Sequence, residues 1–201
     1  MKNLLKIMAV AMLLIIVTVS CKKTPIDPEK EWVMIKGVKW ATRNVDKPGT
    51  FAIKPEDPGM LYQWNKKVGW STTDPMINSD GGTTWDDTDA DGDTWEKMND
   101  PCPTGWRMPT LNEQVSLASA ISKWITLNGI NGHTFGSGDN TLFLPAADIR
   151  DPYNGLLCSA SSGGIYWSGS NGSVLGLNSS NVLPIDYFKR AFGLSVRCVA
   201  E

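Results

Sequence analysis

The sequence has little of what most catalytic and metal centres require. It contains a single histidine, His133, so no second histidine is available for a zinc site. It has neither a P-loop nor a G-x-S-x-G nucleophile elbow. Its 19 basic residues are outnumbered by 21 acidic ones, whereas a nucleic-acid-binding domain usually has a basic excess. These absences favour a protein that is not an enzyme and has no nucleic-acid partner.

The sequence also has no apolar run long enough to cross a bilayer. The longest, Met8–Val19, falls short of the roughly 20 residues that a spanning helix needs. Two lysines precede this run, and a serine and Cys21 follow it, which is typical of a lipoprotein signal peptide. We therefore predict that residues 1–20 are removed and that Cys21 carries acyl chains, such as palmitate, that anchor the protein in the outer membrane. Residues 21–31 would be a charged tether, and an ordinary signal peptide with a chance cysteine is the alternative.

The remaining residues, 32–201, have the size of one domain. Thr110 and Glu113 have the spacing of a helix capping box. The apolar residues after them recur every three or four positions as far as Gly129, which predicts one main helix with a stripe of Leu111, Val115, Ala118, Ile121 and Ile125. Short alternating apolar runs predict strands at 32–36, 38–42, 59–64, 141–144, 165–168, 173–177 and 193–199. The pattern predicts an α+β domain with many short strands, long loops and one main helix.

Three cysteines lie in this domain, and an exported domain can form disulfides. Cys102 lies in a proline-rich corner and Cys198 in the last apolar run. We predict that these two form a disulfide and that Cys158 is a small buried apolar residue. Three free thiols are the alternative.

The most acidic segment of the chain lies between residues 86 and 96. It contains D-x-D-x-D-G, the first half of an EF-hand-like calcium loop. With Asp87 as the first position, the twelfth is Met98, which cannot bind Ca²⁺, so a true EF-hand is excluded. One interpretation is a looser Ca²⁺ site formed by Asp87, Asp89, Asp91, Asp93 and Glu96. The other is a solvated acidic loop without a metal.

The chain contains nine tryptophans. Trp70, Trp85 and Trp95 lie among polar residues, whereas the others lie in apolar runs or motifs. We predict that these three are exposed and stack on the sugar rings of a ligand. Tryptophan also fills cores, so packing is the alternative.

Several motifs resemble one protein family in their order along the chain. Residues 101–110 (PCPTGWRMPT), with Glu113, resemble the CPxGWRxPTxxE hallmark of the Fibrobacter succinogenes major paralogous domain. Further segments resemble its GxYYQWG, LPAAGxR, YWSSS and AxSVRCV motifs, at 59–64, 144–147, 166–170 and 191–199. The match covers residues 32–201. The chain departs from the pattern at Asp148, at Gly169 and in its acidic insert.

The resemblance implies an exported, often lipid-anchored protein with a C-type-lectin-like fold, and it assigns no catalytic residues. It also implies a structural role for Trp106 and Arg107. We expect a non-enzymatic envelope lipoprotein that binds a glycan or a surface protein through residues 71–100, 128–140 and 150–164. A structural component of a surface or fimbrial assembly is the alternative. A polysaccharide hydrolase is less favoured, because it needs two carboxylates that face one cleft.

Overall fold

The computed structural model describes residues 26–201 except 28 and 159–161. Cys21, the predicted signal peptide and most of the tether lie outside the described residues. Among the helices of the described part, none is long and apolar enough to span a membrane.

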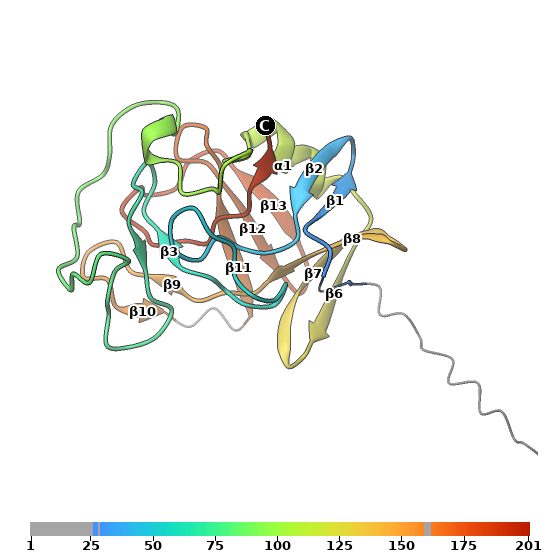
Figure 1. Ribbon diagram of the computed structural model, residues 1–201, viewed down its shortest axis with the longest axis horizontal. Coiled ribbons are helices and arrows are strands. Elements are labelled where there is room, and N and C mark those ends of the chain that lie inside the picture. The colour runs from blue at the N-terminus through green and yellow to red at the C-terminus, as the bar shows by residue number, and fades with distance from the viewer. Residues whose placement is uncertain (1–25, 28, 159–161) are drawn as a thin grey trace, which may run out of the picture.

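Short strands in small antiparallel sheets make up most of the regular structure (Figure 1). The sheets within the described residues have the strand orders β1-β2-β14-β5, β6-β7-β8, β11-β12-β13, β3-β4 and β10-β9. The strands are β1 (Trp32–Ile35), β2 (Val38–Ala41), β3 (Leu61–Tyr62), β4 (Gly69–Trp70), β5 (Trp106–Arg107), β6 (Ser122–Leu127), β7 (Ile130–Ser137), β8 (Asn140–Pro145), β9 (Ile149–Arg150), β10 (Leu157–Cys158), β11 (Gly163–Trp167), β12 (Val174–Asn178), β13 (Val182–Ile185) and β14 (Val199–Ala200).

The predicted fold class is wrong. The only α-helix of the described residues, α1 (Leu111–Ala118), has eight residues, so the fold is β-rich and not an α+β, C-type-lectin-like domain with one main helix. The predicted start is confirmed: Thr110 and Glu113 form the capping box. The predicted apolar stripe is not, because Gln114 and Leu117 are the buried residues of α1 and Val115 is exposed.

The helix ends early because the following residues form the β6–β7 hairpin. Asn128 and Gly129 both have positive φ, 48° and 89°, as a two-residue type I′ turn requires. Leu127 and Ile130 pair on either side of this turn. Asn-Gly between apolar runs is a strong hairpin signal, and here it overrides the helical spacing.

The core lies on both faces of the β11-β12-β13 sheet. Tyr166 and Leu175 pair across β11 and β12 and join one buried cluster, with side chains from β1, β7 and β8. Trp167 and Val174, the next pair, join a second cluster on the opposite face. Because successive residues of a strand point to opposite faces, this sheet is the partition between the two clusters.

The predicted disulfide is confirmed. Cys102 and Cys198 are bonded, with their Cα atoms 6.1 Å apart. The bond ties the segment before β5 to the segment before β14, two strands that pair with each other. The expected burial of Cys158 is wrong, because this free cysteine is exposed.

Arg107 and Trp106 of the hallmark motif lie on β5, next to α1. The Arg107 guanidinium makes two hydrogen bonds to the Glu113 carboxylate, at 2.9 and 2.7 Å, and one to the Met108 carbonyl. Partial burial acts to raise the pKa of Glu113. Hydrogen bonds from Arg107 and Thr110 outweigh this effect and hold the pKa below its usual value.

Glu113→Gln is expected to lower the free energy of unfolding by about 0.5–1 kcal/mol at pH 7. Glutamine still serves in a capping box, so the substitution isolates the ion pair. A lowered pKa contributes stability above the usual pKa of glutamate, and this is lost as the pH falls through the lowered value. The difference between the two proteins should therefore shrink when urea denaturation is repeated near pH 3. An equal difference at both pH values would contradict this role.

Candidate functional site

The three tryptophans predicted to stack on sugars are packed into the protein. Trp70 and Trp95 are only 3% and 8% exposed, and Trp85 is half-buried. Trp70 and Trp85 contact each other, with ring centroids 4.9 Å apart, and Trp95 lies edge-on to Trp64. Two of the indole N–H groups also donate hydrogen bonds to the backbone. Trp85 donates to the Pro152 carbonyl and Trp95 to the Asn99 carbonyl. The expected exposure is therefore wrong for Trp70 and Trp95, and Trp85 is only partly exposed.

The acidic insert does not form the predicted calcium site. Within the described part of the chain, no group of three or more aspartate, glutamate, histidine or cysteine side chains comes together to hold a metal. Asp89 instead accepts a hydrogen bond from the Ala191 N–H at 2.8 Å. Hydrogen bonds from Lys66 and Thr88 lower the pKa of Asp86 to about 2. The residues predicted to bind Ca²⁺ are all exposed: Asp87, Asp89, Asp91, Asp93 and Glu96.

A cleft of about 440 Å³, lined by both polar and apolar residues, lies elsewhere, between segments that are far apart in the sequence. It is lined by Glu56, the Thr72–Thr73 segment, the β6–β7 turn and the loop after β8. The polar residues that line it are Glu56, Asp148, Thr72, Thr73 and Asn131. Ile130, which is 39% exposed, adds an apolar surface. This is the combination of a few convergent polar groups and apolar surface that small-ligand sites use.

Glu56 is the most unusual residue of this cleft. It is only 7% exposed, yet no lysine or arginine in the described residues forms an ion pair with it. Asn128 donates a hydrogen bond to its Oε1 atom at 2.8 Å, and within the described structure Oε2 accepts none. Oε2 is not one of the fully buried polar atoms that lack a hydrogen-bond partner, so it is open to water. A ligand in the cleft could take the place of that water.

Arg150 fixes the threonine wall of the cleft. Its side chain is fully buried, and its Nε and Nη2 atoms donate to the carbonyls of Ser71 and Thr73, both at 2.9 Å. Its Nη1 atom donates to the Gly155 carbonyl at 2.6 Å. Burial lowers the pKa of Arg150, and Asp74, 3.6 Å away, opposes this shift. One guanidinium thus holds the segment that carries Thr72 and Thr73.

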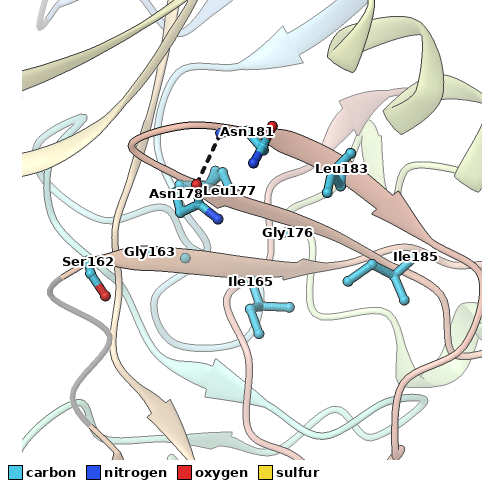
Figure 2. A pocket seen from close by; sticks show the side chains of 10 residues that line it. Ser162, Gly163, Ile165, Gly176, Leu177, Asn178, Asn181, Leu183 and Ile185 are labelled. Atoms are coloured by element: carbon cyan, nitrogen blue, oxygen red, sulfur yellow. Dashed lines mark hydrogen bonds between the residues drawn. The ribbon is translucent and has the colours of Figure 1, made fainter.

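A second hollow, of about 300 Å³, lies on one face of the β11-β12-β13 sheet (Figure 2). Ile165, Gly176 and Leu183 are register partners across the three strands, and Gly176 leaves the middle of the row without a side chain. Leu183 and Ile185 are exposed at its side, and the Asn178–Asn181 turn closes one end. The described residues that line this hollow are uncharged, and several of them are apolar.

No family model, no curated protein and no solved structure matches this chain. The family resemblance therefore depends on the motifs alone and stays a prediction.

The predicted binding loops contribute to the cleft unequally. The segment 71–100 supplies Thr72 and Thr73, and the segment 128–140 supplies the tip of the β6–β7 hairpin. Residues 130–137, expected to be loop, are strand β7, and His133 on it is buried with its Nε2 atom 2.7 Å from the Asn178 carbonyl. The described residues of 150–164 do not line the cleft. Sequence reasoning missed both Glu56, for which no local signal exists, and Arg150, which falls at the arginine position of the LPAAGxR motif.

Proposed function

We propose that this protein is a non-enzymatic, lipid-anchored protein of the outer membrane whose domain binds a glycan in the cleft between Glu56 and Asp148. The observation that carries the proposal is the buried Glu56 carboxylate, which has one oxygen without a hydrogen-bond partner in the described residues, in a cleft with other polar groups. Carboxylates, amides and hydroxyls match the donors and acceptors of sugar hydroxyls. Ile130 would contact the C–H face of a sugar ring.

The envelope location is proposed from the N-terminal sequence and the family resemblance. The Cys102–Cys198 disulfide supports export, because disulfides persist mainly outside the reducing cytoplasm. The acyl chains on Cys21 would provide the anchor.

Filling the cleft is expected to abolish glycan binding. Ala146 is half-buried and lines the cleft, so Ala146→Trp places an indole where the ligand would lie. The measurement is binding of the purified lipoprotein, in detergent, to a glycan array, with a fall of at least 10-fold for every glycan that the unaltered protein binds.

The matched control is Ala120→Trp, at a half-buried alanine that does not line the cleft. It should bind as the unaltered protein does, and circular dichroism should show that both variants are folded. Unchanged binding by a folded Ala146→Trp variant would disprove the cleft as the site. An array on which no glycan binds would disprove the function.

A structural component of a surface or fimbrial assembly is the second candidate function. The observation that favours it is the apolar hollow with exposed Leu183 and Ile185 (Figure 2). Sedimentation of the purified lipoprotein tests whether copies of the chain associate through this face. Association that Leu183→Asp removes would favour assembly, and a monomer at high concentration would count against it.

A further inference from the structure

The charge of the cleft is of one sign. Glu56 and Asp148 both line it, and none of its lining residues is a lysine, arginine or histidine. A ligand that enters the cleft therefore meets two carboxylates and no positively charged group. In a site partly shielded from water, this arrangement favours cationic ligands and repels anionic ones.

Glu56 is placed to bind a cation directly. Asn128, at the β6–β7 turn, donates a hydrogen bond to the Oε1 atom of Glu56 and leaves Oε2 to other partners. Because the side chain is nine-tenths buried, its hydrogen bonds are made with little competition from water. An ammonium group at Oε2 would replace water there with a charge-assisted hydrogen bond.

A bare metal ion does not suit the cleft. It contains two carboxylates, and no third aspartate, glutamate, histidine or cysteine joins them in the described residues. A Ca²⁺ ion takes six to eight oxygen ligands, several of them usually carboxylate. The groups around the two carboxylates, the threonine hydroxyls and the Asn131 amide, suit a polyhydroxylated ligand better.

From these observations, and resting on the glycan-binding function proposed above, we infer that the cleft selects amino sugars with a free, protonated amine. Glu56 is the specificity-determining residue and binds the ammonium group. N-acetylation removes the positive charge of the sugar, and a uronic acid adds a negative one, so both changes weaken binding.

Titration calorimetry with three short oligosaccharides tests this selectivity: glucosamine, N-acetylglucosamine and galacturonic acid oligomers. The unaltered lipoprotein should bind the glucosamine oligomer about tenfold more tightly than its N-acetylated counterpart, the difference between a charged and a neutral hydrogen bond. The galacturonic acid oligomer should bind most weakly. Glu56→Gln should remove the preference for the free amine and leave the affinity for the N-acetylated oligomer within about twofold.

Glu96→Gln is the matched control, because Glu96 is an exposed carboxylate outside the cleft. It should keep the full preference, whereas a loss of preference would show that the net acidity of the protein is responsible and would overturn the inference. If Glu56→Gln fails to fold, Asp148→Asn removes the other charge of the cleft and should reduce the preference. Equal binding of the free and acetylated oligomers would overturn the inference alone, whereas binding of no glycan would overturn the proposed function as well.

Discussion

Removing the Cys102–Cys198 disulfide is expected to lower the free energy of unfolding by about 4–5 kcal/mol. The two cysteines are 96 residues apart, so the bond closes a loop of about half the chain and strongly restricts the unfolded state. Cys198 is fully buried, and alanine avoids placing a hydroxyl there. The measurement is urea denaturation of Cys102→Ala/Cys198→Ala beside the unaltered protein.

Cys158→Ala is the control for this experiment. It removes a thiol that is free and exposed, so the free energy of unfolding should stay within about 0.5 kcal/mol. A reducing agent should lower the stability of the unaltered protein toward that of the double variant. A loss of less than about 1 kcal/mol in the double variant would show that the disulfide contributes little in solution.

The parts of the fold that the sequence predicts are those with local causes. The alternation on either side of Gly37 predicts the β1–β2 hairpin, and the Thr110–Glu113 spacing predicts the start of α1. The end of α1 was mistaken because the same apolar residues fit two periods. The Asn128-Gly129 turn decides between them, and it is a local signal that outweighs the spacing.

The candidate site depends on contacts between distant residues. Glu56 and Asn128 are 72 positions apart, and Arg150 lies 79 positions from Ser71. No spacing rule connects such pairs. The expected exposure of the tryptophans was unreliable for a related reason. Trp85 has polar neighbours in the sequence, but its ring packs on Trp70 and its N–H donates to the Pro152 carbonyl. The exposure of its neighbours does not predict that of the ring.

Arg150→Met is expected to lower the free energy of unfolding by about 4 kcal/mol. Methionine fills the space of the aliphatic part of arginine. It leaves the carbonyls of Ser71, Thr73 and Gly155 without their hydrogen-bond donor. The hydrogen bond to Gly155 is buried and those to Ser71 and Thr73 are partly buried. A buried polar group left unsatisfied costs roughly 1–3 kcal/mol, and a partly buried one costs less because it regains water. Asp74 adds little to this loss, because its carboxylate is 66% exposed and regains water. Urea denaturation measures the effect.

Arg150→Lys separates charge from geometry. Lysine keeps the positive charge, but its compact ammonium group cannot reach carbonyls on both sides as the planar guanidinium does. If the several hydrogen bonds of the planar guanidinium stabilise the fold, this variant should lose at least half as much stability as Arg150→Met. A variant as stable as the unaltered protein would show that charge alone suffices.

The same residue connects stability to ligand binding. Because Arg150 holds the backbone at Ser71 and Thr73, its loss should release the Thr72–Thr73 wall even where the rest of the domain stays folded. If the cleft binds a glycan as proposed, the glycan affinity of Arg150→Met, measured at a temperature where circular dichroism shows a folded domain, should fall by about 10-fold, since a misplaced wall would lose hydrogen bonds to the sugar. Arg150 does not line the cleft, so the proposed preference for a free amine, which depends on Glu56, should persist in the weakened binding. A folded Arg150→Met variant with unchanged affinity would show that the threonine wall takes no part in binding.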